Sequence, residues 1–192
     1  MNVAAAVSSD AFEARYAGGR DPWSFAKDPY ELGRYATILA SLQRPAYRTV
    51  YEPGCAVGIL TRQLSRLAEQ VIATDFAPSA IAQARERCTE CANVQFICSD
   101  LRSFNPRQPL DLIVFSEVGY YFSEGALSAL TVKLAQTLAP GGEFIAAHWL
   151  GTSPDHILHG NRVHAILRAG LSCRAARTEV HARFRLESWV KP

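Results

Sequence analysis

The fold is decided by Val50-Tyr51-Glu52-Pro53-Gly54-Cys55-Ala56-Val57-Gly58, together with the apolar run after it, Val71-Ile72-Ala73-Thr74-Asp75. A buried strand that leads through a glycine turn into a helix presents backbone N–H groups to a ligand. An acidic residue that ends the following strand can bind the hydroxyl groups of a ribose. The pattern therefore predicts a binding site for a nucleoside-containing cofactor.

Composition is typical of one globular domain, which we expect to span residues 1–192. Hydrophobic residues make up 48% and charged residues 20% of the 192 residues, enough to bury a core without disulfides. The formal net charge of +2 is too small to indicate a nucleic-acid partner, and we interpret the basic stretch 162–185 as solvated surface. We expect a monomer or a weak homodimer.

Targeting and metal-binding signals are absent from the sequence. No apolar run approaches the roughly 20 residues that span a bilayer, and residues 1–7 do not resemble a secretory signal, so we expect a cytoplasmic protein. The five cysteines are odd in number and scattered, which fits a reducing compartment. Neither the Cys88/Cys91 pair nor the His156/His159 pair has further ligands at metal-site spacing, so no metal is predicted.

Apolar runs alternate with helical patterns along the middle of the chain. After a poorly ordered stretch at 1–20 and an N-terminal helix within 21–45, the cofactor-binding core occupies 46–150. Its expected strands are 49–53, 71–75, 94–98, 110–115 and 143–147, and its expected helices are 58–69, 78–90 and 124–138. Residues 151–192 should form a helix at 160–169 and an antiparallel hairpin from 173–181 and 183–190. The predicted fold is α/β: a Rossmann-like, doubly wound, mostly parallel seven-stranded sheet with a C-terminal antiparallel hairpin.

Charge near the glycine turn bears on which nucleotide could bind. A dinucleotide fingerprint has a second glycine beside the pyrophosphate, whereas this chain has Ala56 there. Glu52, two residues before the first glycine, would repel a pyrophosphate but would suit the ammonium group of a methionine moiety. The residue types therefore favour S-adenosyl-L-methionine over a nicotinamide cofactor.

This pattern resembles the class I S-adenosylmethionine-dependent methyltransferases, whose turn before the fifth strand is matched by Leu138-Ala139-Pro140-Gly141-Gly142. The resemblance implies that Glu52 and the turn contact the methionine and ribose, that Asp75 binds the ribose hydroxyls, and that Phe76 lies against the adenine. It also implies that Asp100 and Leu101 bind the adenine amino edge. The implied cofactor-binding residues are Trp23, Arg34, Glu52, Gly54, Cys55, Ala56, Gly58, Asp75, Phe76, Asp100, Leu101 and Ser116.

Further motifs resemble the nodulation protein S family. They are Asp21-Pro22-Trp23, Tyr30-Glu31, Arg34-Tyr35, Glu52-x-Gly-Cys-Ala-x-Gly and Ser116-Glu117-Val118-x-Tyr120-Tyr121. Members of that family N-methylate the free amine of a de-N-acetylated chitooligosaccharide, so the resemblance implies an oligosaccharide or small-molecule amine as acceptor. His148-Trp149 and the segment from Asp155 to His164 depart from the family pattern.

Residues for the acceptor follow the fourth and fifth strands. Transfer to an amine needs alignment, exclusion of water and a group that accepts the released proton. Candidate catalytic residues are Glu117, His148 and Tyr121, and candidate substrate-binding residues are Tyr120, Tyr121 and Trp149. Each has an alternative reading: Glu117 could bind backbone, His148 could be a satisfied core histidine, and the aromatic residues could simply pack.

An N-terminal lid is a further hypothesis. Trp23 and the helix carrying Arg34 are expected to cover the cofactor, with Arg34 binding its carboxylate or an acidic substrate, although both could be packing residues. Three other functions remain open: methyl transfer to a different acceptor, a non-catalytic module that binds S-adenosyl-L-homocysteine, and a nicotinamide-dependent dehydrogenase. The last lacks a Tyr-x-x-x-Lys pair.

Overall fold

The computed structural model describes residues 9–19 and 21–192, and these form two compact units, Ser8–Arg107 and Gln108–Pro192. Each unit combines strands with helices. The sequence predicts a single domain over residues 1–192 and gives no sign of this division into two units.

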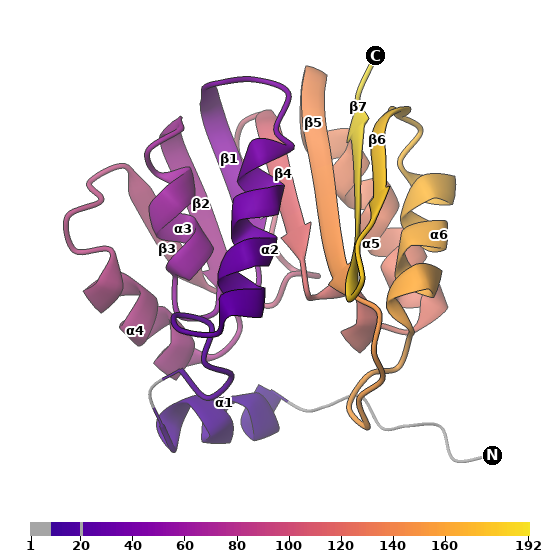
Figure 1. Ribbon diagram of the computed structural model, residues 1–192. Coiled ribbons are helices and arrows are strands. Elements are labelled where there is room, and N and C mark those ends of the chain that lie inside the picture. Colours follow the sequence, from indigo (N-terminus) through magenta and orange to yellow (C-terminus); the bar gives the residue numbers. More distant parts are fainter. Residues whose placement is uncertain (1–8, 20) are drawn as a thin grey trace. The chain divides into compact units, whose positions relative to one another are not determined.

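The first unit is a three-stranded parallel sheet with four helices (Figure 1). Its elements are α1 (Ser9–Ala17), α2 (Pro29–Ala40), β1 (Tyr47–Pro53), α3 (Ile59–Leu64), β2 (Ala68–Asp75), α4 (Pro78–Arg87) and β3 (Val94–Cys98). Strand β2 lies between the other two, with Val50 opposite Val71 and Asp75 opposite Cys98. The carboxyl ends of β1 and β2 therefore lie at the same edge, where parallel sheets bind ligands.

The second unit joins one parallel pair of strands to an antiparallel hairpin. Its elements are β4 (Leu110–Ser116), the 3-10 helix η1 (Gly119–Tyr121), α5 (Glu124–Thr137), β5 (Leu138–Trp149), α6 (Gly160–Gly170), β6 (Arg174–Val180) and β7 (Phe184–Val190). β4 and β5 are parallel, β7 runs antiparallel to β5, and β6 pairs with the other edge of β7. The predicted α/β class, with seven strands and a C-terminal antiparallel hairpin, is confirmed.

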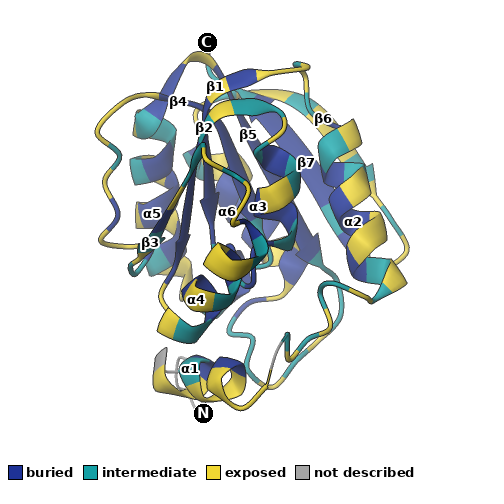
Figure 2. Cartoon of the chain, turned by 90° about the vertical axis from the view of Figure 1, so that its left-hand side faces the viewer, coloured by how far each residue is buried: buried dark blue, intermediate teal, exposed yellow. Residues whose placement is uncertain are grey.

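Burial explains why these segments are strands. β4 is buried along almost its whole length, as Figure 2 shows, which is the pattern of a strand covered on both faces. β6 at the sheet edge is mostly exposed. In the first unit, Cys88 belongs to an apolar cluster with Ala84 and Phe96, and Cys91 packs against that cluster. The Cys88/Cys91 pair therefore has a packing role.

The N-terminal stretch is more regular than the sequence predicts. Residues 1–20 were expected to be poorly ordered, but Ser9–Ala17 forms α1, whereas residues 1–8 and 20 lie outside the described part of the chain. Phe12 and Tyr16, one helical turn apart, are both buried. The carboxylate of Glu13 accepts hydrogen bonds from the backbone N–H and the hydroxyl of Ser79 in the first turn of α4. These contacts hold a helix of weak amphipathic pattern.

Two expected helices end three or more residues early, and the 3-10 helix η1 was missed in addition to α1. The helix expected at 58–69 ends at Leu64 because β2 begins at Ala68. The helix expected at 78–90 ends at Arg87, and η1 was not expected at all. β5 extends beyond the expected 143–147 because Leu138 already pairs with Leu110.

Gly58 provides a test of how α3 and α4 pack. Its backbone is left-handed, with φ +79°, and a Cβ there would lie 3.1 Å from the Cα and Cβ of Ala84. We expect Gly58→Ala to lower the free energy of unfolding by about 1–3 kcal/mol, measured by urea denaturation. The matched control is Gly33→Ala in α2, where a Cβ meets nothing within 4 Å and alanine favours the helix. Equal effects of the two substitutions would contradict the packing argument.

Candidate functional site

The glycine turn between β1 and α3 alternates between ordinary and left-handed backbone. Gly54 has φ +69°, Ala56 +48° and Gly58 +79°. A left-handed conformation costs a non-glycine residue on the order of 1–2 kcal/mol, so Ala56 occupies a glycine-like position. The turn is tied to β2 because the backbone N–H of Cys55 donates to the carbonyl of Thr74 at 2.9 Å. The glycine turn predicted from the sequence is therefore present, with left-handed backbone at Gly54, Ala56 and Gly58.

Asp75 ends β2 and connects this turn to α4. Its Oδ2 accepts the backbone N–H of Ala56 at 3.1 Å, and its Oδ1 accepts that of Ala77, the residue before α4, at 3.0 Å. Burial raises the pKa of this carboxyl to about 6, against the lowering effect of the two hydrogen bonds. Asp75 is therefore largely ionised at neutral pH, and each oxygen has a second lone pair for a ligand hydroxyl.

Glu52 is the buried acid of the turn. Only 4% of its surface is exposed, and its Oε2 accepts a hydrogen bond from the hydroxyl of Thr61. Burial raises its pKa to about 8. A carboxyl group in this state is mostly protonated at neutral pH, and a neighbouring ammonium group would ionise it. Glu52 thus has the property required to bind a cationic ligand.

Asp100 and Leu101 follow β3. Leu101 is buried, whereas the carboxylate of Asp100 accepts hydrogen bonds from the guanidinium and the backbone N–H of Arg102. These bonds lower the pKa of Asp100. Its carboxylate is therefore ionised but already shared with an exposed arginine.

An aromatic cluster surrounds Phe76 and Trp23. Phe76 is 38% exposed, and Phe12 meets it edge-on at a centroid distance of 5.4 Å. Trp23 contacts Phe12 and Tyr16, and stacks on Phe25 at 5.7 Å. Trp23 and Phe76 are therefore connected through Phe12. Phe12 was not predicted as a member of this cluster, although its spacing from Tyr16 is a helical signal.

Arg34 lies on the buried face of α2. Its guanidinium pairs with Glu31 one turn earlier, and it lies over the rings of Tyr30 and Tyr35 at about 5.5 Å. Its side chain is only 1% exposed. This arrangement matches the packing alternative that the sequence left open for Arg34.

In the second unit, Glu117 lies just after β4 and is held there by hydrogen bonds of both its backbone and its side chain. Its backbone is left-handed, with φ +59°, and its N–H donates to the carbonyl of Ala147 at 3.0 Å. Its Oε1 accepts the N–H of Trp149 and its Oε2 accepts the hydroxyl of Tyr120, both at 2.7 Å. The preceding hydroxyl of Ser116 is buried and has no hydrogen-bond partner among residues 9–19 and 21–192.

Four aromatic rings gather beside Glu117. His156 stacks on Tyr120 at a centroid distance of 3.7 Å, and meets the edges of Tyr121 at 5.3 Å and Trp149 at 6.0 Å. Burial lowers the pKa of His156. Together, Glu117, Tyr120, Tyr121, Trp149 and His156 form what we call the aromatic–carboxylate cluster. The sequence predicted all its members except His156, which it considered only as a metal ligand.

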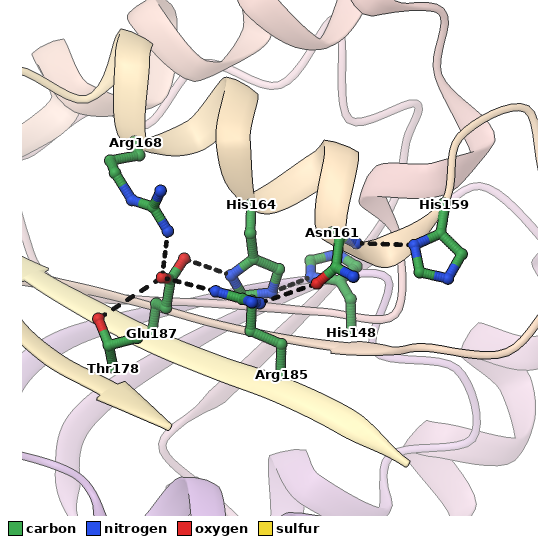
Figure 3. A network of polar contacts seen from close by, with 8 residues as sticks. All are labelled: His148, His159, Asn161, His164, Arg168, Thr178, Arg185 and Glu187. Carbon is green, nitrogen blue, oxygen red and sulfur yellow. Dashed lines mark hydrogen bonds and ion pairs between the residues drawn. The ribbon is translucent and has the colours of Figure 1, made fainter. Parts of the chain in front are cut away.

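His148 lies in a buried polar network rather than on a surface (Figure 3). Its Nε2 is 3.1 Å from the backbone nitrogen of Gly119, and its Nδ1 is 3.3 Å from Nε2 of His164. The Nδ1 of His164 is 2.8 Å from Oε2 of Glu187. Both ring nitrogens of His148 are thus occupied, in line with the core-histidine alternative. Neither His164 nor Glu187 stood out in the sequence.

Residues 9–19 and 21–192 contain neither a membrane-spanning helix nor a cluster of metal ligands. No helix within them is long and apolar enough to cross a membrane. Across 9–19 and 21–192, no group of three or more His, Cys, Asp or Glu residues is arranged to hold a metal ion.

Comparison with known proteins identifies a family and relatives that match most of the chain. A family model described as Nodulation protein S (NodS) matches residues 8–174. Nodulation protein S of Sinorhizobium fredii is 32% identical over 133 residues, covering 68% of this chain and 62% of that protein. The chain therefore spans about three fifths of the length of that relative.

Two other relatives extend the comparison. Phosphoethanolamine N-methyltransferase 3 of Arabidopsis thaliana is 35% identical over 108 residues, covering 55% of this chain and 22% of that protein. The crystal structure of the N-methyltransferase NodS from Bradyrhizobium japonicum, in complex with S-adenosyl-L-homocysteine, matches with a TM-score of 0.85. It is 23% identical and covers 96% of this chain and 98% of that one. This likeness shows the shared α/β fold.

The buried carboxyl of Glu52 predicts a pH dependence of stability. Its pKa of about 8 lies above the usual value of 4.5, so the folded protein holds a proton that the unfolded chain releases between these pH values. The free energy of unfolding should therefore fall as pH rises through this window. In Glu52→Gln, we expect the loss between pH 5 and pH 9 to be smaller by on the order of 2–4 kcal/mol, measured by urea denaturation. An unchanged pH dependence would contradict the raised pKa of Glu52. Asp75, whose pKa is also raised, is present in both proteins, so its contribution to the pH dependence cancels in the comparison.

Proposed function

The chain belongs to the nodulation protein S family, and from this premise we propose that it is an S-adenosyl-L-methionine-dependent methyltransferase. The proposed acceptor is the free amine of an amino sugar or oligosaccharide, and the proposed second product is S-adenosyl-L-homocysteine. We further infer that it acts as a monomer or weak homodimer in the cytoplasm, where its five free cysteines would stay reduced.

The observation that carries this proposal is the buried acid Glu52 in the glycine turn. A buried carboxyl group with a raised pKa gains its charge beside a cation, and it therefore suits an ammonium group, which the methionine part of this cofactor provides. Asp75, ionised and anchored beside the same turn, supplies acceptors for the ribose hydroxyls. The residues therefore fit the cofactor, which when bound supplies a methyl group activated by a sulfonium.

The remaining cofactor contacts are proposed from position. Gly54, Cys55, Ala56 and Gly58 would line the methionine and ribose, and Phe76 would offer its exposed face to the adenine. Asp100 and Leu101 would bind the adenine edge once Arg102 shares the carboxylate with it. Trp23, Arg34 and Ser116 complete the proposed set. Of these, Arg34 would have to divide its guanidinium between Glu31 and the cofactor carboxylate.

Glu117 is the proposed proton acceptor of the amine. Its two side-chain oxygens accept hydrogen bonds from Trp149 and Tyr120, which fix the direction of the carboxylate, and a carboxylate can accept the proton released by the nitrogen. Tyr121, with Tyr120 and Trp149, would flank the amine and exclude water. The ring nitrogens of His148 are already occupied, so Glu117 suits the proton better than His148 does.

A second acceptor class is supported by the same cluster. Aromatic rings beside a carboxylate also suit a small cationic amine, because the ring faces attract positive charge. The similarity to a phosphoethanolamine N-methyltransferase agrees with such an acceptor. Acceptor assays should therefore include amino sugars and small alkylamines side by side.

Asp75 tests the cofactor assignment. Replacing it with alanine removes the carboxylate that would bind both ribose hydroxyls and that holds Ala56 and Ala77. We expect calorimetric titration with S-adenosyl-L-homocysteine to show at least ~100-fold weaker binding in Asp75→Ala. The control is Glu90→Ala, an exposed acid outside the turn, which should bind like the parent protein. Retained affinity in Asp75→Ala would remove this residue from the site.

Glu117 tests the acceptor chemistry. In Glu117→Gln, the side-chain oxygen can still accept from Trp149, but the group no longer accepts a proton. We expect kcat at saturating amine to fall about 100-fold, with unchanged affinity for S-adenosyl-L-homocysteine. If turnover is unchanged, the proton leaves by another route and Glu117 is a structural residue.

A further inference from the structure

The approach of Gly119 to His148 is unusually close. A Cβ at position 119 would lie 2.9 Å from Nε2 of His148 and 2.4 Å from Cγ1 of Val163, so only glycine fits there. The Gly119 N–H donates to that same Nε2 at 3.1 Å. The start of η1 is therefore seated directly on the edge of the imidazole ring.

The direction of this hydrogen bond fixes the protons of the whole network. A backbone N–H can only donate, so Nε2 of His148 carries no proton, and the neutral ring bears its proton on Nδ1. That proton is donated to Nε2 of His164, which in turn must carry its own proton on Nδ1. The Nδ1–H of His164 then donates to Oε2 of Glu187. One consistent set of tautomers satisfies every member.

Glu187 is held ionised at the end of this chain. Burial alone would raise its pKa, but hydrogen bonds from His164 and Arg168 bring the pKa below its usual value. Arg185 also lies 3.4 Å from the carboxylate, and Thr178 lies 3.5 Å from it. Burial lowers the pKa of His164, which favours the neutral form of that ring. Figure 3 shows these side chains converging from α6, β6 and β7.

We propose that His148 is a positioning residue for the acceptor: it fixes Gly119, and through it the segment from Glu117 to Tyr121, while His164 and Glu187 set the tautomer that this hydrogen bond requires. The segment carries Glu117, Tyr120 and Tyr121 of the aromatic–carboxylate cluster. The effect on the acceptor rests on the proposed function, whereas the hydrogen bond to Gly119 does not depend on it.

The other groups around His148 are consistent with this role. Tyr120 meets its ring edge-on at 5.5 Å and Phe115 lies at 5.6 Å, so η1 and β4 present an uncharged hydroxyl-bearing ring and an apolar ring to it. The charges of the network, on Glu187, Arg168 and Arg185, face His164 instead.

Two substitutions separate the functions of the two ring nitrogens. In His148→Gln, the side-chain oxygen takes the place of Nε2 and can still accept from Gly119. In His148→Asn, the side-chain amide takes the place of Nδ1 and can still donate to His164. Each variant keeps one bond of the ring, and His148→Asn is smaller than His148→Gln by one methylene group. His181→Gln, in the turn before β7, is the control for replacing a histidine of this unit.

The first readout needs neither cofactor nor acceptor. Long-range proton–nitrogen spectra of the parent protein should show His148 with a bare Nε2 and a protonated Nδ1; the opposite tautomer would overturn the proposal without any variant. Amide exchange of Gly119 should stay slow in His148→Gln and accelerate at least ~10-fold in His148→Asn, as expected for loss of one buried hydrogen bond. Equal acceleration in both variants would also overturn it.

The second readout is the split between KM and kcat. With an amine acceptor, we expect His148→Asn to raise the KM for the amine about 10-fold, whereas His148→Gln stays close to the parent. Equal losses of kcat in both would identify His148 as the proton acceptor and overturn the positioning role. If the Gly119 results are as expected but no amine is methylated, the proposed function fails while the hydrogen-bond assignment stands.

Discussion

The carboxylate of Asp75 is the interaction on which the first unit depends. One oxygen holds the N–H of Ala56 inside the glycine turn, and the other holds the N–H of Ala77 just before α4. The turn with left-handed residues at Gly54, Ala56 and Gly58 has a hydrogen bond of its own, from the N–H of Gly58 to the carbonyl of Cys55 at 2.9 Å. Asp75 adds an anchor at Ala56 from the neighbouring strand. A residue that holds the turn in this way is also well placed to bind a ligand of the turn.

Each unit contains a buried glutamate, and the pKa is raised for Glu52 in the first unit but lowered for Glu187 in the second. Among residues 9–19 and 21–192, the side chain of Glu52 has the hydroxyl of Thr61 as its hydrogen-bond partner, and burial raises its pKa. Glu187 is surrounded by Arg168, Arg185 and His164, and it stays ionised without any ligand. Because an acid whose charge is already balanced gains little from a further cation, Glu187 suits a structural role and Glu52 suits a binding role.

How much could be predicted from the sequence depends on whether the signal is local. β3 begins and ends where its apolar run does, and the glycine turn followed by Asp75 could be located because backbone geometry depends on spacing. α1 was missed because only Phe12 and Tyr16 of its residues are buried, against partners such as Trp23. The His148–His164–Glu187 chain could not be predicted, since its members lie 16 and 23 residues apart and show no periodic pattern.

The segment from Glu117 to Tyr121 is held mainly by hydrogen bonds of backbone groups. The N–H of Glu117 binds the carbonyl of Ala147, the N–H of Gly119 binds His148, and the carbonyl of Tyr120 accepts the N–H groups of both Ile157 and Leu158. None of these bonds requires a particular side chain at positions 120, 121, 157 or 158. The side chains at these positions can therefore change while the segment keeps its path. If the proposed function holds, the segment after β5, which contributes His156, is where a difference in acceptor among relatives would arise.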